Sequence, residues 1–227
     1  YLSSGGDEAF GDCLIEETFG ASETGCSFGR YRKSDGTYHF VTMSYPTPGR
    51  ANAYPRVGPV VINEVMYHPL DDTDTEYVEL LNVSDGPVTL FDFELMQPWR
   101  FTDNSGIDFW FPVDPPVTLQ KNEHVLLARN AAAVRDLGVP AAVQVFGWNS
   151  GRLANQGERL ELFKPGEMDS MGVRYWIEAD CLVYSDGSHD EDFADGIDPW
   201  PVEADGSGPS LNRLFPSRYG NDPNNWQ

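Results

Sequence analysis

Short runs of β-branched and aromatic residues alternate with glycine and proline turns along most of the chain. These runs predict strands at residues 60–67, 76–81, 88–95, 124–128, 159–163 and 173–184, with a further strand at 38–43. Turn signals such as Asp85-Gly86, Asn104-Ser105-Gly106 and Asp186-Gly187 separate the runs. Many short strands with regular turns are typical of a β-sandwich or a β-barrel.

One strand shows the alternation that half-buried strands have. In segment 76–81, Val78 and Leu80 fall on one face, and Tyr77 and Glu79 fall on the other. The helical signal is confined to residues 131–137, where Asn130 is a suitable N-cap and Gly138 a suitable residue after the C-terminus. We therefore predict an all-β sandwich of about seven to nine strands with one short helix.

The first part of the chain has a different composition from the rest. Residues 1–56 are rich in Gly, Ser and Glu, contain few long apolar runs, and end in a segment with Pro46 and Pro48. Closely spaced prolines disfavour both helix and strand pairing, so residues 44–58 are a candidate linker. We expect an N-terminal extension at 1–56 and a main domain at 57–227.

A short motif occurs twice. The form G-x-S-[FL]-x-R is found at residues 25–30 and again at 208–213. Repetition of this kind is typical of tandem modules, and a chance match between two short segments is the alternative. If the repeat is genuine, residues 1–56 comprise the tail of a preceding module and a linker.

Five segments occur in an order that is similar to one known family. They are VINEVMYHP at 61–69, EYVELLN at 76–82, LANQGERLEL at 153–162, the PWP and DGSGPSL pieces within 199–211, and NDPNNW at 221–226. In this order they resemble bacterial lamin-tail domains over about residues 59–226. The segment PTPGRAN at 46–52 resembles the stretch that usually follows such a domain, which supports the tandem interpretation.

The resemblance implies an immunoglobulin-like sandwich. Bacterial members typically occur in secreted or cell-surface multidomain proteins, often beside hydrolases, and are thought to act in binding or attachment. Two segments depart from the family pattern: Phe91-Asp92-Phe93 stands where a Gly-aromatic turn is common, and residues 166–180 are longer than the usual hairpin. These departures affect local register rather than the fold.

The charge of the chain narrows the class of partner. The formal net charge is −21, because 15 Lys and Arg residues face 36 Asp and Glu residues. Nucleic-acid binding needs cationic side chains to displace counterions, and the sole basic cluster is Arg30, Arg32 and Lys33, a candidate solvated turn. We expect no nucleic-acid partner, and no apolar run is long enough for a membrane span.

The cysteines and histidines offer little catalytic chemistry. Cys13 and Cys26 bracket a short segment and could form a disulfide, whereas Cys181 lies in an apolar run and is expected to be a buried thiol. The histidines His39, His68, His124 and His189 are scattered, and no zinc, phosphate-loop or nucleophile motif is present. We therefore predict no catalytic residues and no bound organic cofactor.

Two acidic clusters could supply the oxygens that Ca²⁺ requires. The candidate ligands are Asp71, Asp72 and Asp74 in the first cluster, and Asp190, Asp192 and Asp195 in the second. Neither cluster matches the EF-hand loop, and solvated acidic loops are the alternative explanation for both.

Two hypotheses about function follow. The first is a non-catalytic binding or attachment module of a larger protein, outside the cell or on the surface of a bacterium. Its partner would be a protein or an extracellular polymer. The second is an accessory domain of an extracellular hydrolase, or a small carboxylate-based hydrolase.

Overall fold

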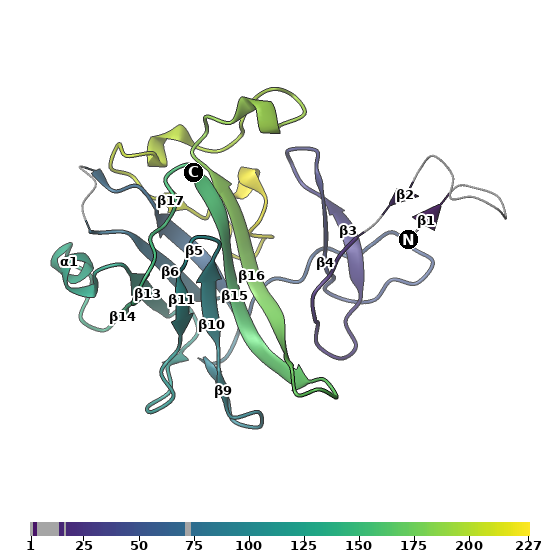
Figure 1. Ribbon diagram of the computed structural model, residues 1–227, viewed down its shortest axis with the longest axis horizontal. Coiled ribbons are helices and arrows are strands. Elements are labelled where there is room, and N and C mark those ends of the chain that lie inside the picture. The colour runs from purple at the N-terminus through teal and green to yellow at the C-terminus, as the bar shows by residue number, and fades with distance from the viewer. Residues whose placement is uncertain (1, 4–13, 16, 71–73) are drawn as a thin grey trace.

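Two β-sheets face each other in the computed structural model, which describes residues 2–3, 14–15, 17–70 and 74–227 (Figure 1). The first sheet contains, in spatial order, β11 (Asp108–Trp110), β10 (Arg100–Asp103), β15 (Gly157–Met168) and β16 (Arg174–Ser185). The second contains, in spatial order, β14 (Gln144–Gly147), β13 (His124–Ala128), β6 (Tyr77–Asn82), β5 (Val60–Met66) and β17 (Leu211–Asn212). Nine strands in two sheets confirm the predicted all-β, immunoglobulin-like sandwich.

Smaller elements join or cover the sheets. The remaining strands form the pairs β1 (Leu2–Ser3) with β2 (Leu14–Ile15), β3 (Phe28–Arg32) with β4 (Tyr38–Thr42), β7 (Val88–Thr89) with β12 (Thr118–Leu119), and β8 (Phe91–Asp92) with β9 (Gln97–Pro98). Single 3-10 turns lie at Asp190–Asp192, Val202–Ala204 and Pro223–Asn225. The predicted helix is α1 (Ala131–Asp136), and the Asn130 side chain caps it by accepting bonds from the N–H groups of Ala132 and Ala133.

The core fills the space between the two sheets. On β6, Val78 and Leu80 are fully buried, as the alternation predicts, and they meet Leu160 and Leu162 of β15 in one cluster. Trp200 and Trp226 lie in the same cluster, each only 4% exposed, with their ring centroids 6.5 Å apart. Burial of such large apolar surfaces is the main source of folding free energy.

A β-bulge divides β16 into two parts. Leu162 pairs with Asp180 while the next residue, Phe163, pairs with Glu178, so Ala179 is the extra residue. After the bulge, even-numbered residues such as Leu182 face the core. Before the bulge, the even-numbered Glu178 instead lies on the outer face, where it binds Arg159. Without the bulge, residues an even number of positions apart would share one face.

A buried ion pair connects the bulge to the other sheet. The Asp180 carboxylate accepts a hydrogen bond from the Ile62 N–H at 2.8 Å and one from Arg213 Nη1 at 2.6 Å. Arg213 Nη1 also donates to the Ile62 carbonyl at 2.8 Å, and Nη2 donates to the Arg218 carbonyl at 2.5 Å. The ion pair therefore provides hydrogen-bond partners for the N–H and the carbonyl of Ile62 in β5, at a place where no neighbouring strand provides them.

The hairpin β3–β4 packs beside β16 and the C-terminal segment, as Figure 1 shows. Val41, Met43 and Ala53 form a small buried cluster with Tyr219. At the tip, the Asp222 carboxylate accepts bonds from the Ser34 N–H at 3.2 and 3.3 Å. The hairpin thus has its own apolar and polar contacts with the main domain, and the predicted boundary at residues 56 and 57 stays a prediction.

A second buried carboxylate holds three segments together. Glu76, 2% exposed, accepts bonds from Arg129 Nη1 at 2.8 Å and from the Leu153 N–H at 2.9 Å. The neighbouring Asp74 contacts the same guanidinium at 3.3 Å, but its side chain is 58% exposed. These two carboxylates therefore offer a matched comparison between a buried and an exposed partner of Arg129.

We expect Glu76→Ala to lower the free energy of unfolding by about 1–3 kcal/mol, because it leaves the buried Leu153 N–H without an acceptor. Asp74→Ala should cost less than about 1 kcal/mol, since water replaces its exposed contact. Urea unfolding followed by tryptophan fluorescence measures both. Equal losses for the two variants would contradict this account of Glu76.

Candidate binding groove

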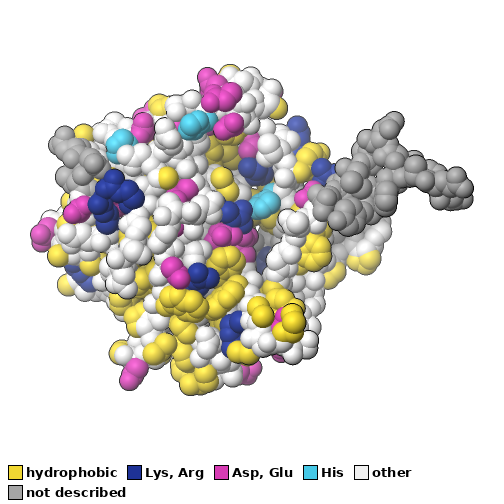
Figure 2. Space-filling model, viewed as in Figure 1, with side chains coloured by type: hydrophobic (Ala, Val, Ile, Leu, Met, Phe, Trp, Pro, Cys, Tyr) yellow, Lys and Arg dark blue, Asp and Glu magenta, His cyan; other side chains and the backbone are white. Residues whose placement is uncertain are grey.

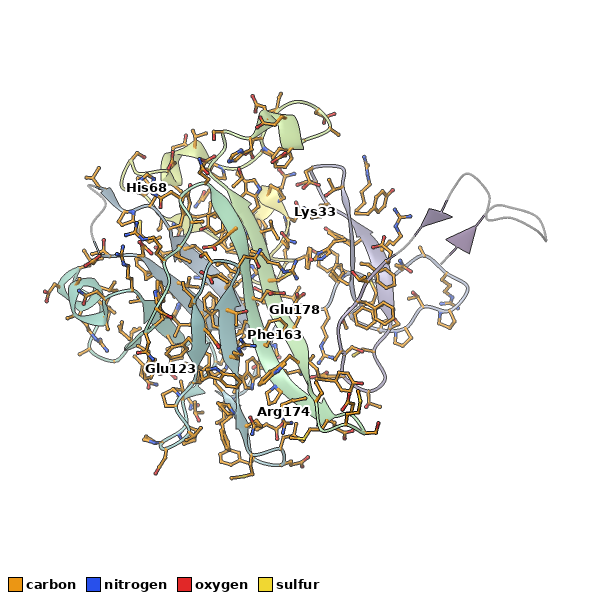
Figure 3. All side chains as sticks on the ribbon, viewed as in Figure 1. Lys33, His68, Glu123, Phe163, Arg174 and Glu178 are labelled. Carbon is orange, nitrogen blue, oxygen red and sulfur yellow. The ribbon has the colours of Figure 1, made fainter. Side chains whose placement is uncertain are left out.

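A groove runs between the β3–β4 hairpin and the outer face of β15–β16. We call this space the hairpin groove. It has a polar end, a cleft of about 660 Å³, and an aromatic end of about 240 Å³, and Arg159 lines both ends. In Figure 3, Lys33 on the hairpin and Glu178 and Phe163 on the sheet mark the two sides.

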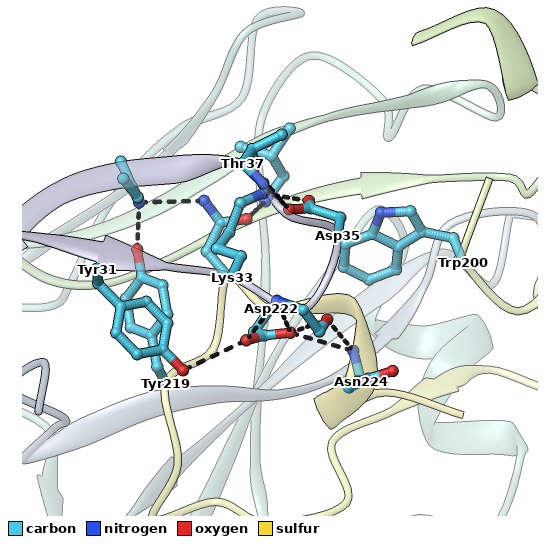
Figure 4. A network of polar contacts seen from close by, with 12 residues as sticks. Tyr31, Lys33, Asp35, Thr37, Trp200, Tyr219, Asp222 and Asn224 are labelled. Atoms are coloured by element: carbon cyan, nitrogen blue, oxygen red, sulfur yellow. Dashed lines mark hydrogen bonds and ion pairs between the residues drawn. The ribbon is translucent and has the colours of Figure 1, made fainter. Parts of the chain in front are cut away.

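The polar end is built from the hairpin tip, β15–β16 and the loop after β16. Lys33 Nζ lies 2.8 Å from Asp35, which also accepts bonds from the Thr37 N–H at 2.9 Å and its hydroxyl at 2.6 Å (Figure 4). Burial acts to raise the pKa of Asp35, but the bonds from Lys33 and Thr37 outweigh it and lower that pKa. Asp35 is therefore ionised at neutral pH, and it neutralises Lys33.

One wall of the polar end carries Glu158, whose pKa is shifted in the opposite direction to that of Asp35. Glu158 accepts hydrogen bonds from the Ser105 hydroxyl at 2.7 Å and from the Ala154 N–H at 2.8 Å. Burial nevertheless raises the pKa of this carboxyl, because desolvation disfavours its charged form. The Tyr184 hydroxyl lies 3.3 Å from the same group.

Arg159 separates the two ends of the groove. Its guanidinium contacts Glu161 at 2.8 Å and Glu178 at 2.7 Å. Burial raises the pKa of the Glu178 carboxyl, while the charge of Arg159 opposes that shift. The charged side chains at this point are therefore paired with one another.

The aromatic end collects rings from both sides of the groove. The sheet contributes Phe163 and Trp176, and the hairpin side contributes Phe19, Phe28 and Phe40. Ring centroids of Phe19 and Phe28 lie 5.0 Å apart, within the usual range for aromatic pairs. This end offers flat apolar surfaces beside paired charges.

In the second acidic cluster, Asp190 and the nearby Asp198 accept backbone hydrogen bonds. Asp190 accepts the Asp198 N–H at 2.8 Å, and Asp198 accepts the Trp200 N–H at 3.0 Å and the His189 N–H at 3.2 Å. Asp192 lines the polar end, and Asp195 is exposed. Within the described residues, no group of three or more His, Cys, Asp or Glu side chains converges as metal ligands would.

One residue of the first acidic cluster, Asp74, lies within the described part of the chain. Asp71 and Asp72 lie outside the described residues, and Asp74 contacts Arg129. Calcium binding by either cluster stays a prediction.

The histidines lie in different environments. His39 contacts the Tyr219 hydroxyl, His68 lies 2.5 Å from Asp205, His124 lies 2.8 Å from Glu79, and His189 lies 3.7 Å from Asp186. The structure therefore does not gather these four side chains into one site.

The cysteine predictions differ in outcome. Cys181 is 1% exposed, as predicted, and burial raises the pKa of its thiol, which makes it unreactive. Cys13 lies outside the described residues, so its disulfide with Cys26 stays a prediction. The Cys26 sulfur accepts a hydrogen bond from Arg56 Nη1 at 3.0 Å.

The basic cluster is spread over the hairpin. Arg30 lies 3.8 Å from Glu17 and 4.2 Å above the Tyr38 ring, and Lys33 pairs with Asp35. Sequence reasoning singled out these cations but missed Arg159, Glu161 and Glu178 as site residues. These residues lie on two predicted strands, 159–163 and 173–184, and the docking of the hairpin over them has no local sequence signal.

Comparisons with known proteins point to one family. The family model described as Lamin Tail Domain matches residues 55–175, which include β5 through β15 and the beginning of β16. No curated protein matches the chain. The matched residues form more than half of the chain and contain the strands that carry most of the core.

Hairpin docking should weaken in acid because of His39. Burial, aided by the charges of Arg159 and Lys33, lowers the pKa of His39 to about 4 from 6.5, and Tyr219 and Asn221 contact its ring. Since the folded pKa is the lower one, the unfolded state binds the proton first as pH falls. The neutral ring therefore contributes stability above about pH 6.5, and that contribution is lost as pH falls towards 4.

We expect the melting temperature of the wild type to drop more between about pH 7.5 and pH 5 than that of His39→Gln. His68→Gln serves as the control, since His68 is a partly exposed histidine paired with Asp205. Parallel melting curves for wild type and His39→Gln at both pH values would show that His39 has no such role.

Proposed function

The chain belongs to the lamin tail domain family, and we propose that it is a non-catalytic binding or attachment module of a larger secreted or surface-exposed protein. The family is a non-enzymatic, immunoglobulin-like module, which is consistent with such a role. The observation that carries the proposal is the hairpin groove, a solvent-accessible concavity of about 660 Å³ at its polar end, lined by tryptophan, phenylalanine and paired charges. Concave sites with aromatic walls and a few placed polar groups are typical of ligand recognition.

The proposed partner is an extracellular polymer or a protein. A net charge of −21 repels polyanions at physiological salt, so nucleic acid and strongly acidic polymers are disfavoured. Within the described residues, no helix is long and apolar enough to cross a membrane. A module of this kind is proposed to act by tethering the protein that contains it.

We also propose that residues up to 56 form the end of a preceding module of the same kind. The two copies of the repeated motif have different surroundings, which supports this proposal. In the second copy, Leu211 is fully buried and the Arg213 side chain is 0% exposed in its ion pair. In the first copy, Phe28 is only partly buried and the Arg30 side chain is 43% exposed, as expected where the core that would bury them belongs to another module.

A groove-filling variant tests the binding function. Gly20 and Asp192 line opposite ends of the groove, both are exposed, and a side chain at Gly20 would meet nothing within 4 Å. The double variant Gly20→Arg with Asp192→Arg therefore narrows both ends without disturbing the core. Gly86→Arg with Asp195→Arg is the matched control, since it has the same charge change and Gly86 also has open space.

We expect fluorescently labelled wild-type chain to bind washed bacterial cell envelopes saturably, and the groove-filling variant to bind at least about tenfold more weakly, a loss of about 1.4 kcal/mol. The control variant should bind like the wild type. Absence of saturable binding, or equal weakening by both variants, would contradict the proposal. Release of soluble fragments from the envelopes by the wild type would instead favour the hydrolase alternative.

A further inference from the structure

Aromatic rings on the outer face of the first sheet face a second group of rings across the aromatic end of the groove. We call the two groups together the aromatic belt; it consists of Trp110, Trp176, Phe163, Phe40, Phe28 and Phe19. The Trp110 and Trp176 rings meet edge to face with centroids 5.2 Å apart, although β10 and β15 lie between their strands. The two indoles therefore lie over those strands, on the surface of the sheet.

The belt is exposed at its two ends, whereas the rings between them are partly buried, namely Phe28, Phe40, Phe163 and Trp176. Trp110 is 43% exposed and Phe19 is 64% exposed, and Figure 2 shows apolar side chains gathered over this part of the sheet. Leaving large aromatic rings in water costs free energy, and contiguous exposed apolar patches commonly mark sites of interaction. The β3–β4 hairpin covers part of the belt, and the exposed rings lie at the two ends of the belt.

Polar groups along the belt are planar and already paired. Arg159 binds Glu161 and Glu178 beside Phe163, and Arg100 binds Asp108 at 2.6 Å while lying 5.2 Å from the Trp110 ring centroid. The belt therefore combines flat apolar rings with guanidinium and carboxylate groups and carries little net charge. That balance contrasts with the charge of −21 on the whole chain.

We propose that the aromatic belt binds a neutral, linear polysaccharide, a proposal that rests on the binding function above and names its ligand class. A pyranose ring has an apolar face of C–H groups, which packs against an aromatic ring, and a rim of hydroxyls. Neighbouring hydroxyls of a sugar can donate hydrogen bonds to the carboxylates of the belt and accept hydrogen bonds from its guanidinium groups. A neutral chain also avoids the repulsion that an acidic protein exerts on polyanions.

A proline-rich peptide is the competing ligand for an aromatic groove, since such peptides dock in the polyproline II conformation. The polar groups of the belt disfavour it. Proline residues have carbonyl acceptors and no N–H donor. The carboxylates of Glu161 and Glu178 are also acceptors, so they cannot form hydrogen bonds with proline residues. Hydroxyl-rich sugars meet no such conflict.

The fold holds the belt in one geometry. The bulge at Ala179 sends Trp176 and Glu178 to the outer face, and the Asp180–Arg213 pair fixes the bulge from the inside. A preorganised surface loses little conformational entropy when it binds a ligand. Successive rings on the sheet and on the docked hairpin suit a ligand with repeating units, such as a polysaccharide chain.

Native affinity electrophoresis in gels containing mixed-linkage β-glucan, glucomannan or pullulan, which are neutral and linear, tests the proposal. At least one of these neutral polymers should retard the wild-type chain. Trp110→Ala and Trp176→Ala should each weaken that retardation about tenfold, as removal of an anchoring aromatic side chain does. Trp176→Phe should retain part of it. Tyr45→Ala is the matched control, because Tyr45 is an aromatic residue that is 61% exposed and lies outside the belt.

Each other outcome overturns the proposal. No retardation by any neutral polymer, retardation that Trp110→Ala and Trp176→Ala leave unchanged, or binding of a fluorescent polyproline peptide in place of the polymers would each refute it. If envelope binding persists in both tryptophan variants and no neutral polymer retards the chain, the proposed function stands and this inference falls. If envelope binding is also absent, both fall. Because Trp110 is exposed, Trp110→Ala keeps the test valid even if Trp176→Ala unfolds.

Discussion

The ion pair between Asp180 and Arg213 joins the first sheet to the second. Asp180 belongs to β16 in the first sheet, Ile62 to β5 in the second, and Arg213 to the segment that follows β17. Both charged side chains are almost fully buried, so each depends on the other for its solvation. Closure of the sandwich on this side therefore depends on a polar contact as well as on the apolar core.

The surface of the sheet depends on that same point. The bulge at Ala179 changes the alternation of β16, so that Leu182 faces the core while Glu178 and Trp176 face outwards. Asp180 is adjacent to the bulge and fixes it from within. The hairpin β3–β4 then lies over the outer face, and the two together form the groove with Arg159 at its centre. The bulge therefore decides which side chains of β16 face the core and which line the groove.

Much of the fold follows from local patterns in the sequence. Alternation in segment 76–81 and the Asn130 cap predict β6 and α1, because both signals depend on neighbouring residues only. The burial of Cys181 also follows from the apolar run in which it lies. The ordered motifs correctly indicated the lamin tail domain family.

The groove could not be predicted in the same way. Residues 173–184 look like one regular strand, and a bulge of one residue leaves no mark on the apolar pattern. The partners Asp180 and Arg213 are 33 residues apart, and Tyr31 and Asp222 are 191 apart, so both contacts exist only in the folded chain. The acidic clusters drew notice for their charge, yet Asp190 and Asp198 mainly accept backbone hydrogen bonds.

The most direct test of this account is a double-mutant cycle on the free energy of unfolding, with Asp180→Leu, Arg213→Met and the double variant. Each single variant should lose about 3–5 kcal/mol, because it leaves an unpaired buried charge. The double variant should lose much less than the sum, because apolar side chains can replace a buried pair. Small losses from the single variants, or losses that simply add, would show that the sandwich and its groove do not depend on this pair.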